Sequence, residues 1–251
     1  MTNWVIIAAG GQGQRMELGF NKIFAKLGRF PVIYWTLAAF EKSKVVDNII
    51  ICAGENDIAK IRAVVKGSKF KKIRQIVAAG KSRQESTLNV LKAFKNKILG
   101  SDLVGVHNAV NPFVTEDEIQ KVYKNAKLFG AALLAQAARD TVKITDGEGF
   151  VAETPLRKYS WYAQTPQVAT FENLYKAHLQ AREDKFVGTD DAQLLERIGI
   201  KPKVVPCSNE NFKITFTQDL AMARYILSSK FNPFDKLRVD AEQSRSIKVQ
   251  S

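Results

Sequence analysis

WVIIAAGGQGQRM, residues 4–16, places a short apolar run directly before three closely spaced glycines. The run is rich in β-branched side chains, which is typical of a buried strand. Glycines carry no Cβ, so backbone N–H groups in this turn can approach an anion closely. Arg15 and Lys22 add positive charge just beyond. The stretch therefore predicts a strand followed by a phosphate-binding loop, with two cations suited to a triphosphate that is attacked at phosphorus.

The loop differs from the two common glycine motifs. A Walker loop ends in Gly-Lys-Ser or Gly-Lys-Thr, and a dinucleotide fingerprint has a third glycine three residues after the second. Gln14, Arg15 and Met16 satisfy neither pattern. Glycines alone are also consistent with a plain turn between a strand and a loop. The position after the first strand, with Arg and Lys following, favours the anion site.

Length and composition set the broad class. A chain of 251 residues with 45% hydrophobic residues is long enough to bury the core of one α/β domain. It contains no run of about 18 apolar residues, and its first residues lack the usual form of a signal peptide, so we expect a cytoplasmic protein. Cys52 and Cys207 are far apart and read as small buried side chains. Two histidines are too few to build a metal site.

The net charge of +13 and the pI near 9.7 raise the question of nucleic-acid binding. The lysines are scattered along predicted helices, without the interleaved aromatic residues of a strand-binding platform. They include Lys42, Lys44, Lys60, Lys66, Lys69, Lys71 and Lys72. Positive charge also attracts small anionic substrates. We therefore do not expect nucleic acid as a partner.

Apolar β-branched runs alternate with segments of helical period through most of the chain, which is typical of a mostly parallel sheet covered by helices. Strands are predicted over residues 5–9, 46–52, 72–77, 103–107, 131–137 and 203–206. Helices are predicted over residues 31–42, 56–65, 82–94, 115–127, 171–182, 190–198 and 218–228. Ser82 is a candidate N-cap, and Thr115 with Glu118 has capping-box spacing. The fold class is therefore α/β.

The alternation is interrupted at residues 140–155, which read DTVKITDGEGFVAETP. Two short alternating runs flank Asp146-Gly147, a typical hairpin turn. A hairpin that projects from an α/β domain exposes two edge strands, which proteins usually cover, most often with a second copy of the chain. We therefore expect a homodimer built through a hairpin arm at about residues 139–159. Residues 1–230 form one predicted domain, and residues 231–251 a C-terminal tail with few apolar side chains.

Several motifs in one order resemble the 2-C-methyl-D-erythritol 4-phosphate cytidylyltransferase family. They are AAGGQGQRM, the Asn21-Lys22 pair before Leu27-Gly28, AAGKSRQEST, VHNAVNPFV, ARDTVK, QTPQ, GTDDA and NFKIT. The resemblance spans about residues 3–228. It implies a Rossmann-like nucleotidyltransferase fold, a dimer with a swapped arm, and a divalent cation, usually Mg²⁺. The reaction it implies transfers CMP from CTP to 2-C-methyl-D-erythritol 4-phosphate and releases pyrophosphate.

The resemblance also implies roles for individual residues. It makes Arg15 and Lys22 the catalytic pair that stabilises charge on the α-phosphate of CTP. It assigns nucleotide binding to Ala8, Ala9, Gly10, Gly13, Gly80, Arg83, Ser86 and Asn108. It assigns the polyol phosphate to Thr141, Arg157, Thr165, Thr189 and Lys213, with Arg157 and Lys213 on the phosphate group. It leaves the metal ligands unknown.

One segment departs from the family pattern. Where the family typically reads His-Asp-Ala-Ala-Arg-Pro, this chain has Asn108 and Asn111, so one negative and one positive charge are absent. Three hypotheses follow: weaker metal binding, a different acceptor such as ribitol 5-phosphate, or a nucleotide-binding protein that has lost turnover. The retained catalytic pair and phosphate-binding cations favour activity. Carboxylates that could compensate are Asp190, Asp191 and Asp219.

Overall fold

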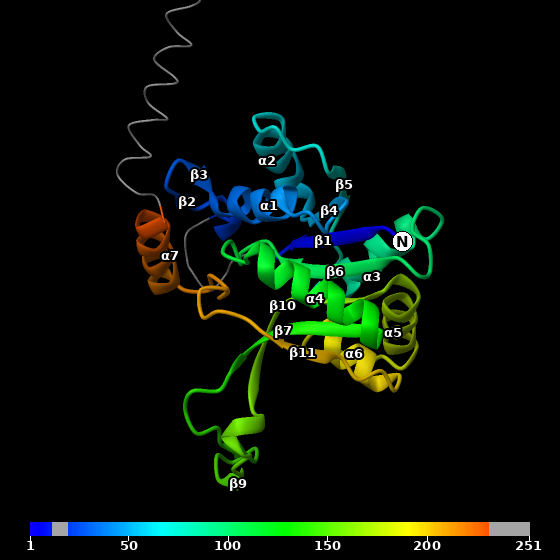
Figure 1. Ribbon diagram of the computed structural model, residues 1–251, viewed down its shortest axis with the longest axis vertical. Helices are drawn as coiled ribbons and strands as arrows, with labels where there is room; N and C mark the ends of the chain where they lie inside the picture. Colours follow the sequence, from blue (N-terminus) through cyan, green and yellow to red (C-terminus); the bar gives the residue numbers. More distant parts are fainter. Residues whose placement is uncertain (12–19, 231–251) are drawn as a thin grey trace, which may run out of the picture.

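The computed structural model describes residues 1–11 and 20–230, and its centre is a seven-stranded sheet between two layers of helices (Figure 1). The strand order is β11-β7-β10-β6-β1-β4-β5. The strands are β1 (Asn3–Ala9), β4 (Asn48–Ala53), β5 (Ile73–Ala78), β6 (Leu103–Asn108), β7 (Ala131–Ala137), β10 (Trp161–Thr170) and β11 (Lys203–Pro206). Within the described part of the sheet, every pairing is parallel except those of β10 with its two neighbours. The predicted mostly parallel α/β sheet is confirmed.

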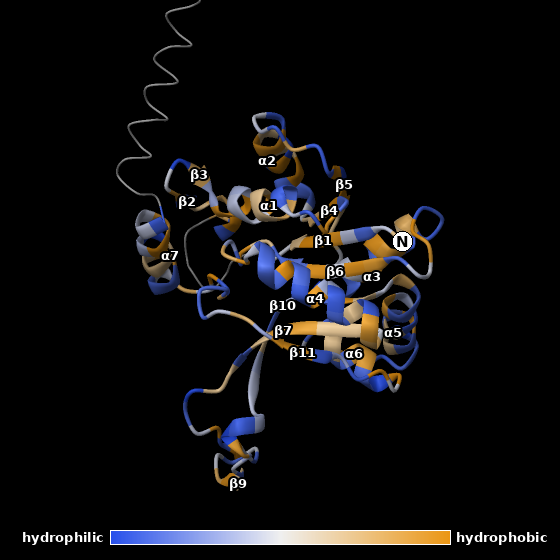
Figure 2. Ribbon diagram, in the orientation of Figure 1, coloured by the Kyte–Doolittle hydropathy of each residue, from blue (hydrophilic) through white to orange (hydrophobic). Residues whose placement is uncertain are grey.

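Two apolar clusters hold the helices against opposite faces of the sheet. One face is covered by α1 (Val32–Lys42), α2 (Glu55–Lys66), α4 (Glu116–Phe129) and α7 (Thr217–Lys230). The other is covered by α3 (Arg83–Phe94), α5 (Phe171–Glu183) and α6 (Asp191–Arg197). Along β1, Val5 and Ile7 face the first cluster while Ile6 faces the second, and all three are fully buried. This burial on both faces explains why the strands read as continuous apolar runs rather than alternating ones, as Figure 2 shows for the sheet.

Local signals placed several helix ends correctly. The Ser82 side chain caps α3 by accepting from Glu85 N. Thr115 caps α4 in a reciprocal capping box with Glu118. Both caps were predicted, because a side-chain oxygen at this position satisfies an N–H group that the first helical turn leaves unpaired.

The longest strand, β10, was missed by sequence reasoning. Its ten residues include Gln164, Pro166 and Gln167, and a proline inside a run argues against a central strand. The structure resolves the conflict with a register shift between Ala163 and Gln167 in the pairing with β7. Proline is tolerated at such an irregularity because the ladder is already interrupted there. The short hairpin of β2 (Lys26–Leu27) and β3 (Phe30–Pro31) was also missed.

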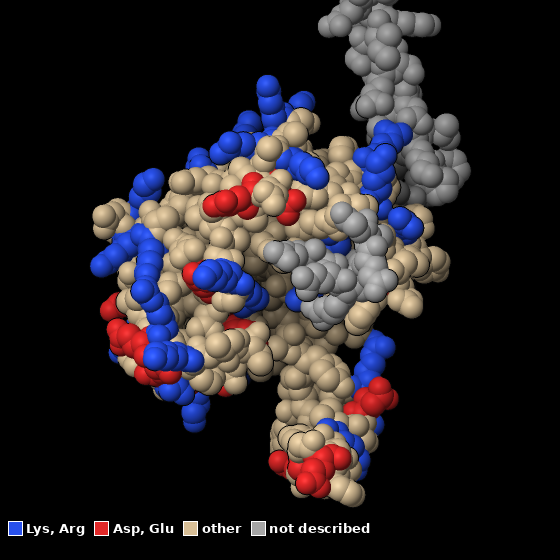
Figure 3. Space-filling model, turned by 180° about the vertical axis from the view of Figure 1, so that it is seen from behind, with Lys and Arg blue, Asp and Glu red and all other residues tan. Residues whose placement is uncertain are grey.

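A two-stranded arm extends from the body between β7 and β10 (Figure 1). Strands β8 (Ile144–Thr145) and β9 (Val151–Glu153) pair antiparallel within the residues predicted as a hairpin. Large apolar side chains on the arm are exposed in this single chain: Ile144, Phe150, Val151, Leu156 and Tyr159. In Figure 3 the arm stands clear of the body, and much of its stem on that face carries neither Lys, Arg, Asp nor Glu.

Among the described residues, no helix is both long and apolar enough to cross a bilayer. The predicted tail, residues 231–251, lies outside the described residues.

Candidate functional site

A cavity of about 520 Å³ opens at the carboxyl ends of β1, β5 and β6. Ligands of open α/β sheets bind at this edge, since the loops that follow the strands converge there. The lining residues come from five segments: Ala8, Ala9, Gly10, Gly11; Asn21, Lys22, Ile23; Gly80, Lys81, Ser82, Arg83, Ser86; Asn108, Val110; and Lys213. Four of these described residues are cations, and none is an Asp or Glu. The cavity is therefore suited to a polyanion.

Lys22 begins the short 3-10 helix η2 (Lys22–Phe24) on the cavity wall and is only 8% exposed. Asn21 caps this turn: its Oδ1 accepts from Ile23 N at 3.2 Å. The Nδ2 of Asn21 donates to Asp57 Oδ2 in the first turn of α2 at 2.8 Å. The backbone that carries Lys22 is thus tied to α2. The predicted partners Arg15 and Gly13 lie outside the described residues.

Gly10 brings two loops together at the end of β1. A Cβ on Gly10 would lie 2.6 Å from the Cβ of Ala79, a separation that real Cβ atoms do not reach. The residue is therefore required for the close approach of the loop after β1 to the loop after β5. This packing reason adds to the sequence-based expectation, which considered only the approach of an anion to the backbone.

The loop between β5 and α3 is held by Ser86. Its Oγ accepts from Gly80 N at 3.0 Å and donates to Ser82 O at 2.6 Å. Ser86 is 6% exposed, so its hydroxyl acts mainly on the loop's own backbone. Gly80, Lys81 and Ser82 then form the rim at the start of α3. The N-terminus of this helix adds a positive dipole end at the cavity.

Arg83 connects this rim to the core behind it. Its Nη2 donates to Asp191 Oδ2 at 2.5 Å, and the Nε2 of His178 lies 3.1 Å from Asp191 Oδ1. Burial alone would raise the pKa of Asp191, but the charge of Arg83 and the hydrogen bond from His178 hold this pKa well below its usual range. A neighbouring cation favours the ionised carboxylate. Asp191 was not predicted as the partner of Arg83.

The turn after β6 carries the segment that departs from the family pattern. Asn108 lines the cavity, whereas Asn111 is completely buried. Asn108 Nδ2 donates to Asn111 Oδ1 at 3.2 Å, and Asn111 Nδ2 donates to Gln164 Oε1 at 3.4 Å. His107 is also completely buried, and burial lowers its pKa to about 4, so it is neutral at pH 7. Its Nε2 lies 3.0 Å from the carbonyl oxygen of Asn111.

The structure brings only some of the residues predicted to bind the polyol phosphate to the cavity. Lys213 lines it, and the buried Thr165 accepts from Asn108 N at 3.3 Å just behind it. Thr189 is exposed and bonded to Gln193, outside the lining. Thr141 and Arg157 lie on the exposed arm, where Arg157 Nη1 donates to Arg139 O at 3.3 Å. These three residues are not assembled around the cavity of the same chain.

The three carboxylates that could compensate for the negative charge missing at Asn108 bond other groups of the protein. Asp191 pairs with Arg83 and His178, and Asp190 caps α6 while accepting from Gln167 Nε2 at 2.8 Å. Asp219 accepts from Thr215 N and Phe216 N at the start of α7. The described residues contain no group of three His, Cys, Asp or Glu side chains able to hold a metal. Mg²⁺ is usually held by one or two carboxylates together with substrate phosphates, so the described lining does not fit a protein-held magnesium site.

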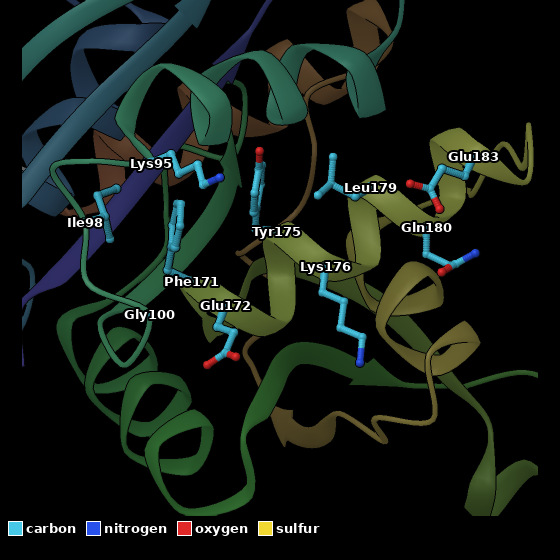
Figure 4. A pocket seen from close by; sticks show the side chains of 10 residues that line it. All are labelled: Lys95, Ile98, Gly100, Phe171, Glu172, Tyr175, Lys176, Leu179, Gln180 and Glu183. Carbon is cyan, nitrogen blue, oxygen red and sulfur yellow. The ribbon is translucent and has the colours of Figure 1, made fainter.

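A second hollow, of about 460 Å³, lies on the surface where α5 meets the end of α3 (Figure 4). Phe171 and Tyr175 stack there with ring centroids 5.6 Å apart, and Lys95 Nζ lies 5.8 Å from the centre of the Tyr175 ring. None of the predicted site residues lines this hollow. The cavity at the strand ends is therefore the candidate site.

Comparisons with known proteins give the same family as the sequence motifs. The family model described as 2-C-methyl-D-erythritol 4-phosphate cytidylyltransferase matches residues 3–229. The chain belongs to this family. A cytidylyltransferase of this name from Geobacter metallireducens is 38% identical over 231 residues, covering 92% of this chain and 99% of the relative. One from Halalkalibacterium halodurans is 40% identical over 226 residues, covering 90% and 97%.

Solved structures of cytidylyltransferases from the family share the fold. The 4-diphosphocytidyl-2C-methyl-D-erythritol synthase of Anaerococcus prevotii aligns with a TM-score of 0.79 and 30% identity over 90% of this chain and 96% of its own. The 2-C-methyl-D-erythritol 4-phosphate cytidylyltransferase of Francisella tularensis aligns with a TM-score of 0.74 and 31% identity over 90% and 99%. The sequence-based resemblance is confirmed over nearly the whole chain.

Proposed function

We propose that the protein transfers CMP from CTP to 2-C-methyl-D-erythritol 4-phosphate and releases pyrophosphate, a step of non-mevalonate isoprenoid biosynthesis. The observation that carries the proposal is the cavity itself. In a chain of this cytidylyltransferase family, Gly10, Lys22, Arg83, Asn108 and Lys213 converge from separate segments on one cationic hollow at the carboxyl edge of the sheet.

The acceptor's phosphate oxygen attacks the α-phosphorus of CTP in line. A new P–O bond forms, the bond from the α-phosphorus to the bridging oxygen of pyrophosphate breaks, and pyrophosphate leaves with the electron pair. A phosphomonoester has its second pKa near 6, so its oxygen is largely deprotonated at pH 7. No general base is needed, which agrees with a described lining that holds no Asp, Glu or His.

Catalysis then consists of positioning and charge stabilisation. Lys22 is nearly buried and held through the Asn21 cap, so its ammonium group stabilises charge that develops on the non-bridging oxygens of the α-phosphate. Arg15 remains its proposed partner. The rim at Gly80 and Arg83 receives the nucleoside, and Lys213 the phosphate of the acceptor. Mg²⁺ remains an expected companion of CTP.

The arm supplies the rest of the acceptor site in a homodimer. Its apolar side chains are exposed in one chain, and a second copy is the occupant that would cover them. Thr141 and Arg157 sit on this arm, away from the cavity of their own chain. We therefore propose that they reach the cavity of the partner subunit. The cytoplasm, which contains the CTP pool, remains the expected location.

Pyrophosphate release measures the proposed activity directly. Purified protein is incubated with each of CTP, ATP, GTP and UTP, against 2-C-methyl-D-erythritol 4-phosphate and ribitol 5-phosphate in turn. We expect release only with CTP and methylerythritol phosphate. Turnover of ribitol 5-phosphate alone would replace the acceptor, and release with none of the pairs would refute the proposal.

A further inference from the structure

We propose that Asn111 is a positioning residue: through a relay of three carboxamides it turns Asn108 so that the carbonyl oxygen faces the cavity and accepts a hydrogen bond from a substrate hydroxyl. The inference rests on the proposed function, because it assigns this oxygen to a substrate of that reaction. It concerns the two positions at which this chain lacks the charges typical of the family.

The relay has one direction along its whole length. Asn108 Nδ2 donates to Asn111 Oδ1 at 3.2 Å, and Asn111 Nδ2 donates to Gln164 Oε1 at 3.4 Å. Asn108 thereby uses its amino group on the side away from the cavity that it lines. Among the described residues no group donates to Asn108 Oδ1. The oxygen is the part of this amide left to a ligand.

The surrounding backbone is held as well. Asn111 N donates to Asn108 O at 3.1 Å, and Thr165 Oγ1 accepts from Asn108 N at 3.3 Å. His107 Nε2 lies 3.0 Å from Asn111 O, which adds a side-chain contact across the same turn. The two asparagines are therefore fixed relative to each other, so a change in one carboxamide is transmitted to the other.

The burial of position 111 explains why a neutral side chain suits it. Asn111 is completely buried, and a charge there would need full compensation, whereas a neutral carboxamide needs only hydrogen bonds, of which its Oδ1 accepts one and its Nδ2 donates one. A carboxamide is nearly symmetric in shape but not in chemistry: turned one way it offers an acceptor, turned the other way it offers two donors. An orienting partner is therefore required if the cavity is to present only the oxygen.

An oxygen acceptor recognises a hydroxyl and gives no attraction to a phosphate. The proposed reaction brings two sources of hydroxyl groups, the ribose of the nucleotide and the carbon chain of the polyol phosphate. The KM for each substrate distinguishes them. Loss of the orientation raises the KM of the substrate whose hydroxyl is bound, by about tenfold for one hydrogen bond, and changes kcat less.

A double-mutant cycle tests the relay. Asn111→Leu removes the acceptor for Asn108 Nδ2, and Asn108→Asp replaces the amide with a carboxylate whose two oxygens are equivalent. A carboxylate presents an oxygen whichever way it turns, so it has no need of Asn111. We expect Asn111→Leu to raise KM about tenfold when residue 108 is Asn and less than twofold when residue 108 is Asp. KM rising equally in both backgrounds, or in neither, would overturn the inference.

Matched controls separate orientation from folding. Asn48 is 7% exposed and lies at the amino end of β4, the opposite edge of the sheet, so Asn48→Leu is expected to lower Tm and leave both KM values unchanged. If Asn111→Leu does not fold, Gln164→Met replaces it in the same cycle with the same expectation. The turnover of the wild-type protein tests the proposed function independently of the relay. Should it be absent, the cycle is measured on the dissociation constants of CTP and of the polyol phosphate, where uncoupled substitutions overturn the relay.

Discussion

Arg83 Nη2 lies 2.5 Å from Asp191 Oδ2, although 108 positions separate the two residues in the chain. Asp191 is 1% exposed, while Arg83 keeps 30% of its side chain exposed at the rim of the cavity. The pair therefore joins a residue that lines the cavity to a carboxylate in the core. The other oxygen of Asp191 is bonded to His178, which is completely buried in α5. The position of the guanidinium group is set by the packing of α5 and α6 behind it.

Asp191→Asn tests this connection. The variant keeps the shape of the side chain but removes the charge opposite Arg83, and breaking a buried pair from one side costs about 3 kcal/mol of unfolding free energy. We expect a corresponding loss in denaturant unfolding and a higher KM for CTP, because Arg83 loses its anchor. Asp184→Asn is the matched control: Asp184, at the end of α5, also pairs with an arginine, Arg197 of α6, but at the surface. Equal effects of both substitutions would contradict a special role for Asp191.

His107 predicts a dependence of stability on pH. Burial lowers its pKa from 6.5 to about 4 in the folded protein, whereas the unfolded chain takes up the proton near pH 6.5. Between these values the unfolded state binds more protons, so stability falls as the pH drops from 6.5 to 4, by about 3 kcal/mol in all. His107→Gln keeps a donor for the Asn111 carbonyl and removes the titration. Urea unfolding from pH 4 to pH 7.5 is expected to show a flatter profile for the variant. The same profile in both proteins would refute the assignment.

Lys22 is expected to matter for the chemical step. Removing one preorganised group that stabilises transition-state charge typically costs about 10²–10³-fold in kcat. We expect a loss of this size for Lys22→Gln, with a much smaller change in the KM for CTP. Lys26→Gln, on an exposed residue four positions later, is the matched control and should retain wild-type turnover. A variant at Lys22 with wild-type kcat would remove this residue from the catalytic group.

Much of the fold follows from local pattern, and its exceptions have physical causes. Strands buried on both faces, such as β4 with Ile49, Ile50 and Ile51, are unmistakable as apolar runs. β10 was missed because Gln164, Pro166 and Gln167 are polar or conformationally restricted. Their partners lie across the structure: Gln164 bonds Asn111, and Gln167 bonds Ala192 N and Asp190. Tertiary hydrogen bonds here replace the apolar pattern that sequence reasoning requires.

The candidate site was likewise predicted only in part from the sequence. Gly10, Lys22, Gly80 and Lys213 were predicted from motifs and line one cavity in the structure. The partner of Arg83 was not predicted, because no local rule connects positions 83 and 191. Arg157 has a predicted role but no place in its own chain's cavity. The sequence predicts the arm and, through the family resemblance, a swapped dimer, but a single chain does not show where Arg157 acts.

Mixed dimers test whether the arm acts in the cavity of the partner subunit or in the cavity of its own chain. Lys22 lines the cavity of the body and Arg157 lies on the arm, so a substitution at each disables a different component of the site. In a heterodimer of one Lys22→Gln chain and one Arg157→Gln chain, an arm that reaches its partner leaves one site with both defects and the other with none. An arm that serves its own cavity leaves every site with one defect.

We therefore expect each homodimeric variant to be nearly inactive and the heterodimer, isolated with two different affinity tags, to recover about half of the wild-type kcat per dimer, since one of two sites is intact. Light scattering is expected to give twice the chain mass for all three. Phe150→Asp with Val151→Asp places charge on the exposed apolar surface of the arm and should yield monomers with an unchanged Tm of the body. A heterodimer as inactive as its parents, or a wild-type monomer at micromolar concentration, would rule out arms that act in the partner's cavity.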